Sequence, residues 1–411
     1  MACCLFISIP LFSQETAPDP DEVIARLFSN EKDTSRGAYD YIEKNKPVII
    51  AQKLGDSLIA GGDSEDKETA LNLLKMYPFA SVKDVYVRVL GLTNSFLVKK
   101  EVITILGNTG DRAYVIPISK ELESPFSVVR EKAIQILRNI GDDRMFPVIV
   151  KMSEKKDPVF RVYALEALSR LYDFRLLSVV QNLLQDENKS VRILALQCTQ
   201  KNNIDKLFPI IRTLALNDSN IEVRVEAINS LNKLNDTGSL SVLLKLINND
   251  AKEIRLSTAL ALQHLKLKQS VYAVSEQLAI ESDTHIKSIL IDTLIEMRDG
   301  GGFKGFDREI SNEEYLPLRV KSVYALGVIG GPRAMGFLLK ALSDKEFKVR
   351  AEACSSLSIY RDRGVLNGLL GIVKEDPERY VRLAALYSIE KIRDKTSVIP
   401  LYDQYSLEKD P

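Results

Sequence analysis

The sequence predicts an all-α protein, an α-solenoid (superhelix) of about twelve helix pairs, each 31 or 32 residues long. The first observation behind this prediction is a basic residue that recurs at that interval, since a fixed period of roughly 20 to 50 residues is typical of solenoids. The second is helical spacing of apolar residues around each basic residue, and the third is the lack of any long stretch with strand-like alternation. The twelve basic residues are Arg36, Lys67, Lys99, Arg130, Arg161, Arg192, Arg224, Arg255, Lys287, Arg319, Arg350 and Arg382.

The second helix of each pair contains the basic residue. Counted from that residue, apolar side chains recur at positions −1, +3, +4 and +7, which form one face of an α-helix. Position +3 is alanine in seven repeats, and a side chain this small lets a neighbouring helix approach closely. These alanines are Ala70, Ala133, Ala164, Ala195, Ala227, Ala353 and Ala385.

An aspartate four to six residues before the basic position marks the start of this second helix in many repeats. Aspartate accepts hydrogen bonds from the free N–H groups of a first turn, and its charge suits the positive end of the helix dipole. The aspartates are Asp157, Asp186, Asp218, Asp250, Asp283, Asp344 and Asp376.

Apolar runs between these helices predict the first helix of each pair. Two helices of about 10 to 14 residues use up the period and leave room only for short turns. The clearest runs are 115–122, 146–152, 176–184, 207–216, 240–247, 334–342 and 365–373.

One pair departs from this pattern, and residues 299–318 are predicted to form an irregular loop. Four glycines lie within 300–305, each costing a helix roughly 1 kcal/mol relative to alanine, and Pro317 disfavours helix toward Arg319. Phe303, Phe306 and Tyr315 would then lie on a loop. They either fold back to fill the place of the missing helix or form a partner-binding loop with aromatic anchors.

The repeats resemble HEAT repeats, in particular the short kind first noted in phycobilisome lyases. The resemblance is carried by runs such as 157–168, 220–231 and 347–357, and it extends from about Asp21 to Tyr405. It implies that each second-helix arginine packs against the turn aspartate of an adjacent repeat, in a structural ladder; a row of ligand-binding arginines is the alternative. The residues of this ladder are Arg161, Arg192, Arg224, Arg255, Arg350 and Arg382 with Asp157, Asp186, Asp218, Asp250, Asp344 and Asp376.

The composition favours neither nucleic-acid binding nor catalysis. Basic and acidic residues number 56 each, whereas a phosphate-binding surface usually carries excess Lys and Arg. His264 and His285 lie in different repeats without further ligands at metal-binding spacing. The glycine pattern at 300–305 lacks the strand that a dinucleotide site needs. We therefore expect no enzyme activity, cofactor or metal site.

The N-terminal segment is distinct from the repeats. Residues 1–13 are apolar and end in a small residue, as in a secretory signal peptide, although the usual basic start is missing, which leaves open a start upstream. Residues 14–20 are predicted to be a linker, 21–405 the solenoid and 406–411 a tail. After the N-terminus, no stretch reaches the ~20 apolar residues that cross a bilayer.

These observations predict a non-catalytic protein–protein interaction scaffold of the cell envelope, exported and either periplasmic or envelope-associated, whose partner is another protein. One alternative is a periplasmic assembly, maturation or lyase-type accessory protein. Another is an intracellular nucleic-acid binder, which the signal peptide and the balanced charge disfavour.

Overall fold

The computed structural model describes residues 17–60, 62–168, 176–299, 301–312 and 314–395. Over these ranges it contains helices and turns but no strand, which confirms the predicted all-α class. The chain divides into two compact units, Met1–Asn202 and Asn203–Pro411. In both units we call the odd-numbered α-helices A helices and the even-numbered ones B helices.

The first unit contains six described helix pairs. The basic residue of each period lies on the B helix, so the predicted order of helices in a repeat is confirmed. The helices are α1 (Pro20–Leu27), α2 (Lys32–Asn45), α3 (Val48–Ile59), α4 (Ser64–Lys75), α5 (Phe79–Leu92), α6 (Phe96–Asn108), α7 (Val115–Lys120), α8 (Ser127–Ile140), α9 (Phe146–Ser153), α10 (Pro158–Leu168), α11 (Leu176–Leu183) and α12 (Lys189–Asn202).

The second unit also contains six described pairs. Short 3₁₀ turns such as η4 (Asp205–Leu207) lead into several of its A helices. The helices are α13 (Phe208–Asn217), α14 (Ile221–Lys233), α15 (Leu240–Leu246), α16 (Lys252–Leu265), α17 (Val271–Ile280), α18 (Thr284–Met297), α19 (Phe303–Ile310), α20 (Leu316–Ile329), α21 (Gly331–Ala341), α22 (Phe347–Leu357), α23 (Arg363–Glu375) and α24 (Arg379–Ile392).

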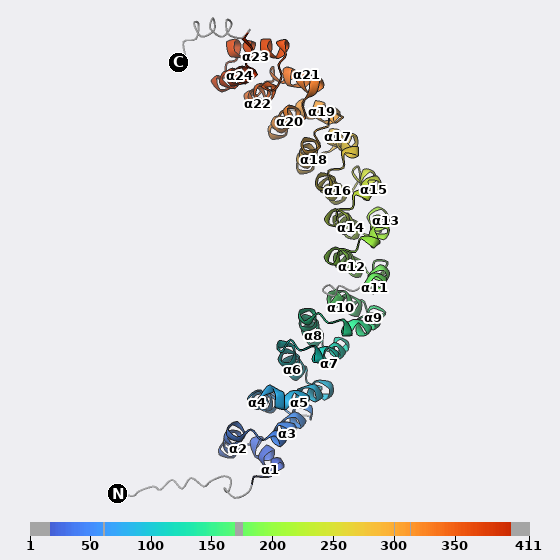
Figure 1. Cartoon of the computed structure of the whole chain (residues 1–411), viewed down its shortest axis with the longest axis vertical. Helices are drawn as coiled ribbons and strands as arrows, with labels where there is room; N and C mark the ends of the chain where they lie inside the picture. Colours follow the sequence, from blue (N-terminus) through green and yellow to red (C-terminus); the bar gives the residue numbers. More distant parts are fainter. Residues whose placement is uncertain (1–16, 61, 169–175, 300, 313, 396–411) are drawn as a thin grey trace, which may run out of the picture. The chain divides into compact units, whose positions relative to one another are not determined.

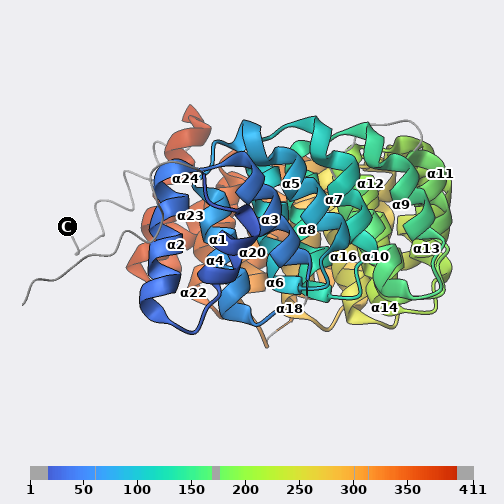
Figure 2. The same ribbon diagram turned by 90° about the horizontal axis from the view of Figure 1, so that it is seen from below.

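Each unit is a two-layer stack. A B helix packs against the A helix of its own pair and against the B helix of the next pair, as α22 does with α21 and α24. Figure 1 looks nearly along the helix axes and shows that, within a unit, B helices form one layer and A helices the other. Figure 2 shows the same helices lengthwise, joined by short turns. Each pair therefore buries its apolar face against its neighbours rather than in one central core.

The predicted register of the B helices is confirmed by burial. All seven alanines at position +3 have zero exposed surface, as have most of the aliphatic residues at position +7, for example Leu137 and Leu231. A side chain no larger than a methyl group at +3 therefore lies where two B helices touch. The repeat pattern in the sequence is a pattern of close helix contacts.

The prediction of an irregular loop at 299–318 is wrong. The A helix is present as α19, which begins at Phe303 with Gly302 as its N-cap residue. Phe303 and Phe306 are buried at 4% and 0% exposure, so they face the core at helical spacing. Pro317 lies in the first turn of α20, where its missing N–H is not needed and its fixed φ suits the helix.

The glycine inside α19 has a packing reason. A Cβ at Gly305 would lie 2.7 Å from the backbone oxygen of Ser275 and 2.8 Å from Leu278 Cβ, both on α17. Without a Cβ, the backbone of Gly305 can lie close to α17, and its N–H donates a hydrogen bond of 3.0 Å to Ser275 Oγ. The lost helix propensity is thus offset by tight packing of α19 on α17.

Gly305→Ala is expected to destabilise the protein by about 1–3 kcal/mol, because the new methyl group overpacks the α17–α19 contact. Gly336 on α21 is the matched control, since a Cβ there meets nothing within 4 Å. Gly336→Ala is expected to stabilise by up to about 1 kcal/mol through helix propensity. Urea unfolding followed by circular dichroism measures both, and a stabilising Gly305→Ala would contradict this packing.

The predicted signal peptide at 1–13 and the predicted tail at 406–411 lie outside the described residues. The same is true of part of the 14–20 linker and of the last ten residues of the predicted solenoid. Among the helices that the structure does describe, none combines the length and apolar character needed to cross a membrane.

Candidate functional site: the arginine ladder and an aromatic face

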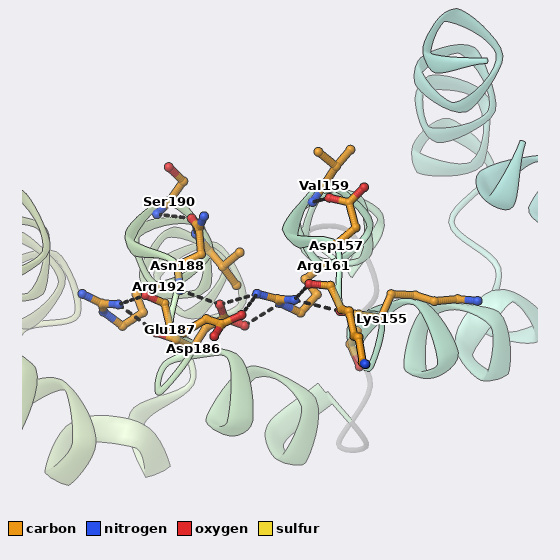
Figure 3. Close-up of polar contacts among 12 residues, drawn as sticks. Lys155, Asp157, Val159, Arg161, Asp186, Glu187, Asn188, Ser190 and Arg192 are labelled. Atoms are coloured by element: carbon orange, nitrogen blue, oxygen red, sulfur yellow. Dashed lines mark hydrogen bonds and ion pairs between the residues drawn. The ribbon is translucent and has the colours of Figure 1, made fainter. Parts of the chain in front are cut away.

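Arg161 shows how one repeat is joined to the next. Its Nε and Nη2 atoms lie 2.7 Å and 2.8 Å from the two carboxylate oxygens of Asp186, in the turn before the next B helix. Both side chains are only 8% exposed. In Figure 3 the guanidinium of Arg161 points at this carboxylate and at the neighbouring Glu187. Such a bidentate, charge-assisted contact has both strength and a fixed geometry.

The same arginine also holds its own turn. Arg161 Nη1 donates to the carbonyl oxygens of Lys155 and Lys156, at 2.8 Å and 2.6 Å, where helix A has ended. Carbonyls at a helix C-terminus lack partners within the helix and carry partial negative charge, which a guanidinium satisfies. The carbonyls five and six residues before the arginine are bound in the same way by Arg130, Arg192, Arg255, Arg350 and Arg382.

The carboxylate that receives the arginine also organises its own turn. Asp186 Oδ1 accepts the backbone N–H of Asn188 at 2.8 Å, and Asn188 in turn accepts the N–H of Ser190 near the start of α12. Asp344 and Asp376 accept the N–H two residues later in the same manner. Each turn is therefore fixed from within its repeat and from the preceding repeat.

Other repeats contain equivalent contacts, which we call rungs. In each one the basic residue pairs with a carboxylate 22 to 26 residues later. Two rungs use lysine, and three use glutamate in place of aspartate. The rungs are Lys99–Glu121, Arg161–Asp186, Arg255–Glu281, Lys287–Glu309, Arg319–Asp344 and Arg350–Asp376.

Two rung carboxylates, Glu281 and Asp376, are stabilised in their ionised form. Burial disfavours the charge of Asp376, but hydrogen bonds from Arg350 and from the Glu378 N–H outweigh burial and lower its pKa. Glu281 behaves alike, since bonds from Arg255 and from backbone N–H groups lower its pKa in spite of burial. The hydrogen bonds to Asp376 raise the pKa of Arg350. These two rungs are thus charged at neutral pH.

The predicted ladder is correct for Arg161 with Asp186 and for Arg350 with Asp376, and it differs at Arg224 and Arg255. Arg224 does not pair with Asp250, which is exposed; Arg224 Nε donates to the carbonyl of Ala215 at 3.1 Å. Arg255 binds Glu281, because Asp283 caps α18 through the N–H groups of His285 and Ile286.

The remaining predicted ladder residues serve their own turns. Asp157 accepts the N–H of Val159 at the start of α10, and Asp218 accepts the N–H of Asn220. Arg192 and Arg382 bind turn carbonyls, as described above. The aspartates before the B helices therefore organise their turns, and Asp186, Asp344 and Asp376 also receive a rung.

Arg350→Ala is expected to destabilise the protein by about 3 kcal/mol, because it leaves the buried Asp376 carboxylate without its cation. Arg224→Ala removes one bond to a carbonyl and is expected to cost only about 1 kcal/mol. Urea unfolding of the two variants at pH 7 compares them, with Lys374→Ala, an exposed lysine on α23, as a neutral control.

The free energy of unfolding of Arg350→Ala is also expected to depend on pH differently from that of the parent protein. The pKa of Asp376 is lowered in the folded state, so its contribution is present above the ordinary aspartate pKa and lost as pH falls through the folded value. The stability of Arg350→Ala should therefore approach that of the parent protein below about pH 4. If the difference in unfolding free energy between Arg350→Ala and the parent protein stayed the same down to pH 2.5, a charged rung would be contradicted.

The predicted partner-binding loop is not a loop. Phe303 stacks on Phe337 of α21 with ring centroids 6.1 Å apart, and the guanidinium of Arg333 lies 5.4 Å above it. Phe306 is fully buried, so both phenylalanines belong to the core and fill the A layer. Tyr315 is 43% exposed at the start of α20 and is the one member of the predicted trio at the surface.

A different aromatic surface lies on the B layer of the second unit. Large apolar side chains that packing does not cover lie on α20, α22 and α24, three B helices that contact one another in succession. They are between 37% and 66% exposed. We call this surface the aromatic face; its residues are Tyr324, Phe347, Tyr380, Leu383 and Tyr387.

Sequence analysis missed this face although a signal was present. Tyr324 and Tyr387 both occupy position +5 of their repeats, on the side of the helix opposite the core positions. Position +5 is polar in most other repeats, for example Asn72, Gln135 and Asn229. An aromatic residue at a repeat position that is normally polar marks a surface selected for something other than packing.

Reactive side chains are dispersed. His264 and His285 are both exposed and lie on different helices, α16 and α18. Burial raises the pKa of Cys198 to about 11 and that of Cys354 to about 12, which keeps both thiols protonated. Within the described ranges, no group of three or more His, Cys, Asp or Glu is placed to hold a metal ion.

Comparison with family models gives one result. A model described as HEAT repeats matches residues 115–200, 176–263, 204–295 and 310–390, which together exceed half of the chain. The chain belongs to the HEAT-repeat family. The alternation of A and B helices and the ladder between turns are thus features of a HEAT solenoid. No protein with a curated functional description matches the sequence.

Solved helical-repeat structures are similar to the chain at low identity, and the Kap121p structure shares its fold. The karyopherin Kap121p bound to the SUMO protease Ulp1p is 12% identical, over 94% of this chain and 50% of that one, with a TM-score of 0.51. Importin beta is also 12% identical, over 91% and 55%, with a TM-score of 0.48. The complex of CpcE and CpcF of phycocyanin lyase from Nostoc sp. PCC7120 is 15% identical, over 56% and 94%, with a TM-score of 0.32. This HEAT-repeat chain spans about half the length of the Kap121p and importin beta chains.

Proposed function

We propose that this HEAT-repeat protein is a non-catalytic protein–protein interaction scaffold that binds its partner on the aromatic face. The observation that carries this proposal is the run of exposed aromatic side chains over three successive B helices. Exposed apolar patches on soluble proteins commonly mark interaction sites, and tyrosine and other aromatic residues dominate the binding energy of interfaces.

The ladder supports this function because it fixes the spacing of the helices beneath the face. Arg319 of α20 binds Asp344 in the turn before α22, and Arg350 of α22 binds Asp376 in the turn before α24. A surface held in place before binding loses less entropy when a partner docks. Tyrosine adds large contact area at little cost in side-chain freedom.

The comparisons and the composition are consistent with a protein partner. Kap121p, a solenoid with the same fold, was solved bound to a protease, although the likeness extends to the fold alone. The chain has 56 basic and 56 acidic residues, so its net charge offers no general attraction to nucleic acid.

Affinity capture tests the proposed face. The full chain, a Tyr324→Ser/Tyr387→Ser double variant and a Tyr272→Ser variant serve as three baits in envelope extract. Tyr272 is a matched control, since it is 69% exposed but lies on α17, in the A layer. We expect a protein that the full chain and the control retain and that the double variant depletes at least tenfold, as loss of two aromatic anchors predicts.

Recovery of the same proteins on all three baits would contradict the aromatic face as the binding site. Capture of nucleic acid, lost at higher salt, would instead support the alternative of a nucleic-acid binder. The double variant should keep the melting temperature of the parent chain, because both tyrosines are at least half exposed.

We also propose that the protein acts outside the cytoplasm, in the periplasm or at the envelope. The support is the apolar segment 1–13, which is followed by polar and acidic residues. N-terminal sequencing of the native protein is expected to begin near Gln14. A native protein that retains Met1 and is recovered in the cytosol would contradict export.

A further inference from the structure

A recess of about 380 Å³ lies at the aromatic face, where Phe347 and Tyr380 line it. Val320 of α20, Phe347 of α22 and Tyr380 of α24 contribute apolar walls, so three successive repeats take part. Glu352 and Lys348, one helical turn apart on α22, supply its charged groups. The recess is large enough for one long side chain of a partner and lies within the surface proposed above for protein binding.

Glu352 differs from every carboxylate of the ladder. It is half-buried, and the hydrogen bond that the structure gives its carboxylate comes from the Ser356 hydroxyl at 3.3 Å. Burial raises its pKa, an effect that the Ser356 hydroxyl only partly offsets. Within the described chain no cation pairs with it, whereas each rung carboxylate has one. A desolvated carboxylate without a cation is a cost to folding that an incoming cation removes.

Lys348 does not fill this role although its spacing would allow it. It precedes Glu352 by four residues, but its ammonium lies 6.0 Å from the centroid of the Phe347 ring instead of on the carboxylate. Lys348 is exposed at the rim, where an ion pair with a flexible side chain contributes little. The interior of the recess thus keeps one negative group beside aromatic walls.

We infer that this recess binds a lysine or arginine side chain flanked by apolar residues on a segment of the partner protein. The inference rests on the proposed function and adds the chemistry of the contact. The aliphatic stem of such a side chain covers Val320, its charged head reaches Glu352, and aromatic rings favour a cation at their faces. The flanking apolar residues then contact Tyr324 and Tyr387 on either side.

Peptide selection tests this inference. A random nonapeptide phage library is selected on the immobilised full chain, and the enriched sequences are expected to contain Lys or Arg between apolar residues. One selected peptide and its counterpart with glutamine in place of the basic residue are then measured against the full chain and Glu352→Gln. We expect Glu352→Gln to weaken binding of the basic peptide at least tenfold and binding of the glutamine peptide less than threefold. Only the basic peptide uses the charge of Glu352.

Two controls make the result specific. Glu352→Gln keeps the shape and the Ser356 contact, so its unfolding midpoint should equal or exceed that of the parent chain. Lys348→Gln removes a positive charge at the rim that repels the basic residue of the peptide, so its affinity for the basic peptide should be equal or higher. Weaker binding by Lys348→Gln, or equal binding of the basic peptide by Glu352→Gln, would overturn the inference.

The outcomes also separate this inference from the proposed function. Selection of apolar peptides without a basic residue, with binding lost in Tyr324→Ser/Tyr387→Ser, would overturn the basic-residue recess and leave the aromatic face intact. Selected peptides that still bind this double variant would overturn both. Failure of the library to yield any binder would overturn the recess alone, since a folded partner can still use the face.

Discussion

The arrangement of this solenoid depends on guanidinium groups that, in several repeats, bind the turns on both sides of a B helix at once. In Arg161 and Arg350, Nη1 binds two carbonyls of the turn before its own helix, while the other nitrogens face the carboxylate of the next turn. Both contacts are directional, so a B helix cannot slide along its neighbour by one turn without losing them. The constant period of 31 or 32 residues is the sequence consequence of this geometry.

Much of the fold was accessible from the sequence because packing repeats with the period. The alanines at +3 and the aliphatic residues at +7 are buried as predicted. The acceptors of the ladder were less predictable, since an acidic residue near a turn can receive an arginine or cap a helix. Glu281 receives the rung where Asp283 was the aspartate noted in the sequence, and only Ser282 lies between the two. Only the path of the turn decides which carboxylate faces the preceding repeat.

Helix α19 and the aromatic face show the limits of composition as a guide. The glycines at 300–305 indicated flexibility, yet position 305 requires a glycine because α17 lies too close for a Cβ. Phe303, Phe306 and Ile310 have helical spacing, a signal that the glycine count outweighed. In contrast, Tyr324 and Tyr387 repeat at a position without packing demands, so their meaning for binding emerges only when α20, α22 and α24 are known to adjoin.

The contact of Arg224 with Ala215, rather than with Asp250, has a mechanical meaning. Units that touch only their neighbours respond to a pulling force as springs in series, and the softest junction extends first. Between the pair α13–α14 and the pair α15–α16 the helices still pack, but no ion pair from Arg224 reinforces the step. Under load this junction relies on helix packing and on the pair between Arg212 of α13 and Asp236 in the turn before α15, a different linkage from the rungs beneath the aromatic face.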